Sequence, residues 1–97
     1  MNIRSIFQNK VIIADCVPIG IPELGFAYLN DNGMWNITIN SKSTACHNKT
    51  ITVGQLLEIF EKSSKCFPAM EERFQEELPL MIEEIKKFEM SDLVEFH

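Results

Sequence analysis

The residues best suited to chemistry are glutamates near the end of the chain. If residues 70–88 form a helix, a rotation of about 100° per residue puts Glu72, Glu76 and Glu83 in a row opposite the apolar side. We name these three residues the acidic ridge. Carboxylates in such a row can pair with Lys and Arg, so the ridge is a candidate contact for a basic protein partner. Two further candidates lie on one flank of the ridge, namely Glu77 and Glu84.

Two other interpretations of the ridge compete with protein binding. A solvated helix face has the same pattern, and Lys87, four residues after Glu83, dilutes the negative charge. A metal ion could be held by Glu72 and Glu76, which lie one helical turn apart. Hard cations need six or more oxygen ligands, and no histidine or further carboxylate is spaced to supply them. We therefore expect no metal site.

Catalytic patterns are weak in this sequence. Cys46 and His47 are the only adjacent cysteine and histidine, but a short strand expected near residues 44–47 would point them to opposite faces. Asp15 interrupts an apolar run, and it either accepts a backbone N–H or serves as a functional carboxylate. P-loop, dinucleotide-binding, CxxC and HExxH patterns are absent from the sequence. We predict no enzyme activity and no cofactor.

The cysteines and the N-terminal residues bear on the cellular location. Cys16, Cys46 and Cys66 are an odd number without close pairing, which favours free thiols in a reducing compartment. The apolar run at residues 11–17 contains Asp15, and no cleavage motif follows it, so a signal peptide is not predicted. No stretch reaches the roughly 18 apolar residues of a membrane span. We expect a cytoplasmic protein that does not bind membranes.

Charge is divided unevenly along the chain. Residues 1–50 carry four basic and three acidic side chains, a net charge of +1, whereas residues 51–97 carry five basic and eleven acidic ones, a net charge of −6. The sum is the −5 of the whole chain. A field of this kind attracts basic partners and repels nucleic acid and anionic membranes, so we expect no nucleic-acid binding.

A β-hairpin is predicted over residues 26–39. Asn32-Gly33 supplies the positive φ angles of a two-residue type I′ turn. The register set by this turn places five apolar residues on one face: Phe26, Tyr28, Trp35, Ile37 and Ile39. We expect this face to pack in the core, although on an uncovered face Trp35 and Tyr28 would anchor an interface.

The remaining elements follow from apolar spacing and from capping residues. The apolar run at residues 11–17 predicts a strand buried on both faces, and Pro18 and Pro22 enclose a predicted loop. Thr52 and Gln55 form a capping box that opens a helix ending near residues 63–64. Ser91-Asp92 suggests a cap for a final helical turn.

The last long helix carries one apolar stripe with a proline inside it, and Pro79 should kink it. The stripe consists of Met70, Phe74, Leu78, Met81, Ile82, Ile85 and Phe88. Strands followed by helices indicate an α+β fold. We predict a single domain, residues 1–97, with an antiparallel sheet of about three or four strands covered by two C-terminal helices.

In its size, its acidity and its lack of catalytic motifs, the chain resembles bacterial immunity proteins, which neutralise a cognate toxin and often a nuclease. The resemblance implies a small inhibitor that occludes the active site of a basic toxin. It transfers no residue roles, because immunity proteins span many unrelated folds. The ridge or the polar residues 40–49 would form the contact. The rival interpretations are a structural or adaptor subunit that forms a homodimer through a sheet edge or the C-terminal segment, and a small enzyme.

Overall fold

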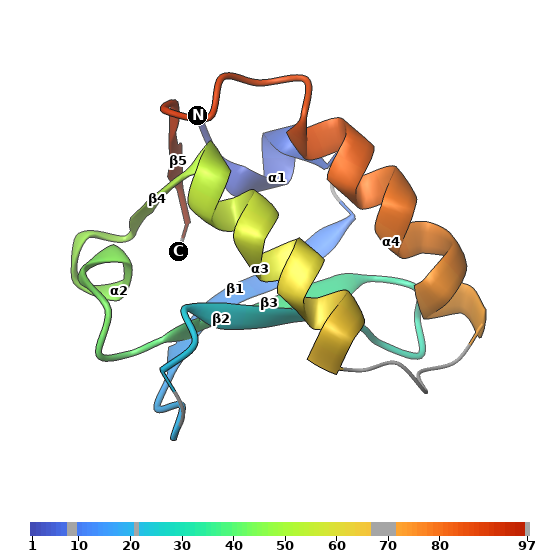
Figure 1. Cartoon of the computed structure of the whole chain (residues 1–97), viewed down its shortest axis with the longest axis horizontal. Coiled ribbons are helices and arrows are strands. Elements are labelled where there is room, and N and C mark those ends of the chain that lie inside the picture. The colour runs from blue at the N-terminus through green and yellow to red at the C-terminus, as the bar shows by residue number, and fades with distance from the viewer. Residues whose placement is uncertain (8–9, 21, 67–71, 97) are drawn as a thin grey trace.

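Three strands form the larger of two sheets in the computed structural model, which describes residues 1–7, 10–20, 22–66 and 72–96. The strands are β1 (Val11–Val17), β2 (Gly25–Leu29) and β3 (Trp35–Asn40), in the order β1-β3-β2. Two long helices, α3 (Val53–Cys66) and α4 (Glu72–Ile85), pack together over one face of this sheet (Figure 1). The predicted α+β class is confirmed.

The prediction of an antiparallel sheet is only partly correct, because β1 runs parallel to β3. Between Val17 and Gly25 the chain passes through a proline-containing loop, and β2 then forms two strand positions away from β1. β3 returns into the position between them. Apolar runs and turns predict the strands themselves but not this order.

The predicted hairpin is present with a register shifted by one residue. Leu29 pairs with Trp35 and Ala27 with Ile37. The loop has three residues, because the Asn30 carbonyl accepts the Gly33 N–H at 3.0 Å and the Asn30 N–H donates to Met34. Gly33 has a φ of 79°, so a positive φ falls on this glycine and not on Asn32. The predicted two-residue turn is therefore wrong.

The shifted register changes which hairpin residues share a face. Ala27 and Leu29 join Trp35 in the core, whereas Phe26 and Tyr28 lie on the opposite face, where Tyr28 is 40% exposed. The rings of Phe60 and Phe74 lie 5.4 Å and 5.3 Å from that of Trp35. The prediction that Trp35 packs in the core is confirmed, and the shared face with Tyr28 is wrong.

Two short helices precede the long ones. The first, α1 (Ile3–Ile6), buries Ile3 and Ile6. The second, α2 (Thr44–Asn48), replaces the strand expected near residues 44–47. Ser43 begins α2 by accepting the Cys46 N–H on its hydroxyl at 3.2 Å, and Lys49 ends it with a left-handed φ of 54°. These local bonds favour a helical turn over a strand.

The capping box at the start of α3 is confirmed. The Thr52 N–H donates to Gln55 Oε1 at 3.0 Å, and the Gln55 N–H donates to Thr52 Oγ1 at 3.1 Å. The helix continues two residues beyond the predicted end, to Cys66. In α4 the stripe residues Phe74, Leu78, Met81 and Ile85 are buried, and Pro79 lies within the helix. Met70, the first predicted member of the stripe, lies outside the described residues.

A second, smaller sheet corrects the prediction for the C-terminal residues. Leu93–Glu95 forms strand β5, which pairs antiparallel with β4 (Thr50–Thr52) instead of forming a helical turn. The Asp92 carbonyl accepts the Val53 N–H at 2.9 Å, so its backbone belongs to this pairing and does not cap a helix. The Glu95 N–H donates to the Met1 carbonyl at 2.7 Å, which ties the N-terminus to the same sheet.

Cys16 and Cys46 form a disulfide, which overturns the prediction of three free thiols. Their Cα atoms lie 5.9 Å apart although 30 positions separate them in the chain. The bridge joins the end of β1 to α2, and only the folded topology brings these two segments together. Among the described residues, no helix has the length and apolar content needed to cross a bilayer.

Candidate protein-binding surface on the last helix

One side of α4 packs against the core, and the opposite side is exposed. Phe74 contacts the ring of Trp35, and Leu78, Met81 and Ile85 continue the buried line along the helix. Glu72, Glu76 and Glu83 of the acidic ridge are exposed. The arrangement follows from helical periodicity, because residues opposite a buried stripe must face solvent.

The structure divides the five candidate glutamates into two groups. Glu77 lies 3.2 Å from Arg73 Nε, and Glu84 lies 3.0 Å from Lys87 Nζ, so both flanking glutamates are paired within their own helix. Within the described ranges, the three ridge carboxylates form no salt bridge and no side-chain hydrogen bond. Lys87 pairs with Glu84 and forms no salt bridge with Glu83 among the described residues.

Exposed charges on α3 behave differently from the ridge. Lys62 Nζ lies 3.0 Å from Glu23 and 3.2 Å from Glu58. Two hydrogen bonds raise the pKa of the Lys62 ammonium, the larger effect coming from Glu23 and the smaller from Glu58. Glu23 and Glu58 thus already have a cation within the molecule, unlike the three carboxylates of the ridge in the described part of the chain.

An apolar side chain lies beside the ridge, and sequence reasoning missed it. Leu80 is 61% exposed, four residues after Glu76 and three before Glu83. At these spacings side chains are neighbours on a helix surface. The signal was present in the sequence, since Leu80 is an apolar residue outside the apolar stripe. An exposed leucine bordered by carboxylates has the composition of an interface anchor with a polar rim.

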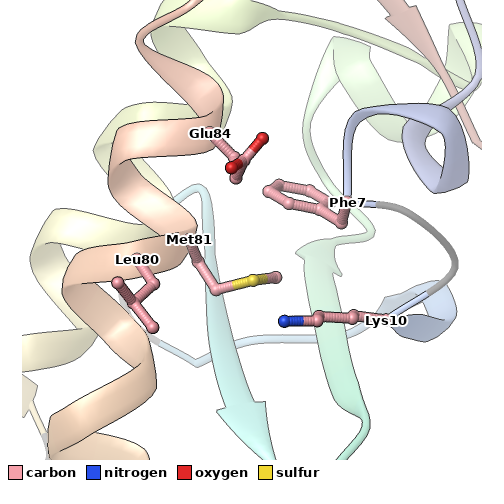
Figure 2. Close-up of a pocket in the computed structure, with 5 residues that line it drawn as sticks. All are labelled: Phe7, Lys10, Leu80, Met81 and Glu84. Atoms are coloured by element: carbon pink, nitrogen blue, oxygen red, sulfur yellow. The ribbon is translucent and has the colours of Figure 1, made fainter.

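A pocket of about 180 Å³ opens next to Leu80. Phe7 and Met81, both nearly buried, form its apolar part, and Lys10 and Glu84 lie at its edges (Figure 2). In Figure 2 the Lys10 side chain extends toward Met81 from the segment that leads into β1. The pocket is large enough to receive one side chain of a partner, and its walls come from both ends of the sequence.

Comparison with known proteins finds no matching family model, no similar curated protein and no similar solved structure.

The other predicted sites are not brought together with the ridge. Asp15 is exposed, and its carboxylate accepts the Cys16 N–H at 2.8 Å, which confirms the structural interpretation of this residue. His47 is exposed on α2, and its neighbour Cys46 is oxidised in the disulfide. In the described part of the chain, no three side chains of the His, Cys, Asp or Glu type gather to hold a metal ion.

Proposed function

We propose that this protein is a small protein-binding inhibitor that uses the exposed side of α4 to bind a basic partner. The acidic ridge supplies charge, and Leu80 supplies the apolar contact. Charge complementarity raises the association rate, whereas burial of an apolar anchor slows dissociation. The partner would present Lys or Arg side chains around an apolar depression that receives Leu80.

One observation carries this proposal: Leu80 is exposed between carboxylates that have no partner within the described part of the chain. Exposed leucines are common on protein surfaces, and exposed glutamates are more so. Their combination on one rigid helix, beside a pocket of about 180 Å³, is the pattern of an interface core with its rim.

The specific form of the proposal is an immunity protein that neutralises a basic toxin, such as a nuclease, by occluding its active site. A nuclease cleft is lined with cations that bind phosphates. The row formed by Glu72, Glu76 and Glu83 would place carboxylates where phosphates bind. The protein would then act as a competitive inhibitor and have no catalytic role of its own.

The test is capture of partners from a lysate of the native host at low and high salt, with mass spectrometry of the retained proteins. The triple variant Glu72→Gln, Glu76→Gln, Glu83→Gln should lose a basic partner that the wild type retains. The matched control replaces three exposed glutamates elsewhere, Glu61, Glu89 and Glu95, by Gln and should retain it. Equal retention by both triple variants would remove the ridge from the proposal and favour residues 40–49 as the contact.

Self-association is a second candidate function, supported by exposed apolar residues near the N-terminus and β5. Met1 is 41% and Leu93 60% exposed, and the two residues are joined by a backbone hydrogen bond. Val94 and Phe96, which belong to the C-terminal segment expected for a homodimer contact, are buried within the chain and cannot contribute. Light scattering of the wild type and of Leu93→Asp tests this function. Self-association predicts that the wild type is a dimer and that the variant is a monomer.

A cytoplasmic location stays a prediction, and the disulfide removes one of its grounds. Disulfides persist mainly in oxidising compartments. Cys16 and Cys46 lie outside the acidic ridge and outside the pocket beside Leu80, so the proposed contact does not require the bridge. Thiol trapping in intact cells would show whether these cysteines are oxidised or reduced in the compartment where the protein binds its partner.

A further inference from the structure

The Cys16–Cys46 disulfide has different surroundings at its two sulfur atoms. Lys49 Nζ lies 3.6 Å from Cys16 Sγ. Both cysteines are partly exposed, and Lys49 is exposed. This contact of a cation with the Cys16 sulfur makes the two halves of the bridge chemically unequal.

The backbone holds Lys49 in this place. Its N–H donates to the carbonyls of Ala45 and Cys46, and its own carbonyl accepts the Phe96 N–H at 3.0 Å. A left-handed φ of 54° is unusual for a residue with a side chain, and these bonds fix it. The lysine therefore starts from an anchored backbone at the end of α2 and reaches across to β1.

Two other ionisable side chains are neighbours of the bridge along the chain. The Asp15 carboxylate opposes a negative charge on Cys16, but it accepts the Cys16 amide, whereas the Lys49 ammonium reaches the sulfur itself. His47 follows Cys46 and is exposed. The Lys49 ammonium is the cation in contact with a sulfur of the bridge, and that sulfur belongs to Cys16.

We propose that this disulfide is a thiol-exchange site with a fixed direction of attack. The thiolate of a small external thiol forms a bond to Cys46 Sγ, and the Sγ–Sγ bond breaks. Its electron pair stays on Cys16, which leaves as a thiolate next to the Lys49 ammonium. The products are a mixed disulfide on Cys46 and a free Cys16 thiolate, and a second external thiol completes the reduction.

The direction follows from the leaving group. Thiol–disulfide exchange is faster when the departing sulfur is the more stable thiolate, and a nearby Lys stabilises that form. The Lys49 ammonium donates its hydrogen bond to the sulfur of Cys16, so Cys16 is the better leaving group. The position of Cys46 is kept by bonds other than the bridge, because Ser43 Oγ donates to the Asn40 carbonyl at 2.7 Å and accepts the Cys46 N–H. Cys46 thus stays in place for the bridge to close again.

The test uses the full chain with Cys66→Ser, so that only two cysteines remain. The oxidised protein is mixed with 2-mercaptoethanol at pH 8, quenched with acid at short times, alkylated and mapped by mass spectrometry. We expect the first adduct mainly on Cys46. Lys49→Gln should slow the exchange several-fold and distribute the adduct over both cysteines, whereas the matched control Lys42→Gln should behave like the parent protein.

Three results would overturn the proposal: an adduct mainly on Cys16, equal behaviour of the Lys49 and Lys42 variants, or absence of the bridge in the air-oxidised protein. A second measurement does not depend on how the mixed disulfide is trapped. In the reduced protein, iodoacetamide should alkylate Cys16 several-fold faster than Cys46, and Lys49→Gln should remove this difference. Equal alkylation rates in the Lys49 parent would contradict the proposed role of the lysine.

Discussion

The hydroxyl of Ser63 joins α3 to the edge strand β2 of the larger sheet. It accepts the Ala27 N–H at 2.8 Å and donates to the Ile59 carbonyl at 2.7 Å, in a position that is fully buried. β3 pairs with the other edge of β2, so this edge would otherwise have a buried amide without a partner. The helix therefore covers the sheet with apolar side chains and also satisfies one of its backbone groups.

Replacing Ser63 by Ala should destabilise the protein by about 1–3 kcal/mol, because the Ala27 N–H stays buried and loses its acceptor. Ser64→Ala is the matched control. The Ser64 hydroxyl donates to the Glu61 carbonyl in an exposed position, so its loss should change the free energy of unfolding by less than about 0.5 kcal/mol. Urea titration of both variants measures the difference. Equal free energies of unfolding would mean that a water molecule replaces Ser63 as the acceptor of the Ala27 N–H.

The hairpin turn provides a second prediction. Gly33→Ala should cost about 1–2 kcal/mol, because a side chain at a φ of 79° is strained; the end of the flexible Arg73 side chain, which lies at the position of the new Cβ, only has to move aside. Gly20 has open space around the position of a Cβ and no positive φ, so Gly20→Ala should not destabilise. Thermal unfolding of the two variants compares them directly, and a neutral Gly33→Ala would contradict the turn described here.

The disulfide should stabilise the protein by an amount that grows with the logarithm of the length of the loop that it closes. With a sequence separation of 30 between the cysteines, the chain-entropy model gives about 3.7 kcal/mol. Reduced protein should therefore unfold at a lower urea concentration than oxidised protein. The Cys66→Ser background keeps the third thiol from exchanging during the measurement. If the two midpoints coincide, the bridge does not constrain the unfolded chain.

The ion pairs of Lys62 should make a contribution to the free energy of unfolding that is lost at alkaline pH. Its hydrogen bonds to Glu23 and Glu58 raise its pKa above the ordinary 10.5. A raised pKa means that the stabilising contribution is complete below 10.5 and is lost as the pH rises through the folded-state pKa. The difference in unfolding free energy between the wild type and Lys62→Gln should accordingly shrink at high pH. A difference that stays constant up to pH 12 would argue against these ion pairs in solution.

Sequence reasoning succeeded where one local rule decided the structure. The capping box of Thr52 and Gln55 and the apolar stripe from Phe74 to Ile85 depend on residues only a few positions apart. The hairpin register was missed by one residue because the Asn30 side chain accepts the Asn32 and Met34 amides and so stabilises a longer turn. Side-chain bonding of this kind competes with the turn type that the Asn-Gly pair favours.

Pairings across long stretches of chain could not be predicted from the sequence. The bridge between Cys16 and Cys46, and the contact of β5 with β4, depend on how β1 and the C-terminus are placed by the whole fold. Three of the five predicted site residues are free for a partner, whereas Glu77 and Glu84 are paired within α4. Their pairing partners, Arg73 and Lys87, were visible at helical spacing and could have indicated this.

The apolar anchor is the most specific part of the proposed binding mode, and it has a matched control in the same chain. Leu80 and Leu93 are exposed to almost the same extent, 61% and 60%, at different places on the surface. Leu80→Asp should weaken binding of the captured basic partner by about 2 kcal/mol or more, which corresponds to roughly thirtyfold or more in Kd. Leu93→Asp adds the same charge outside the proposed contact.

The Kd of that partner for the wild type, Leu80→Asp and Leu93→Asp decides whether the exposed side of α4 is the binding surface. The three values are measured side by side after circular dichroism has shown that both variants are folded. The binding mode proposed here predicts that Leu80→Asp loses the affinity and that Leu93→Asp keeps it. Equal affinities of the two variants, or a loss confined to Leu93→Asp, would show that the exposed side of α4 is not where this protein binds.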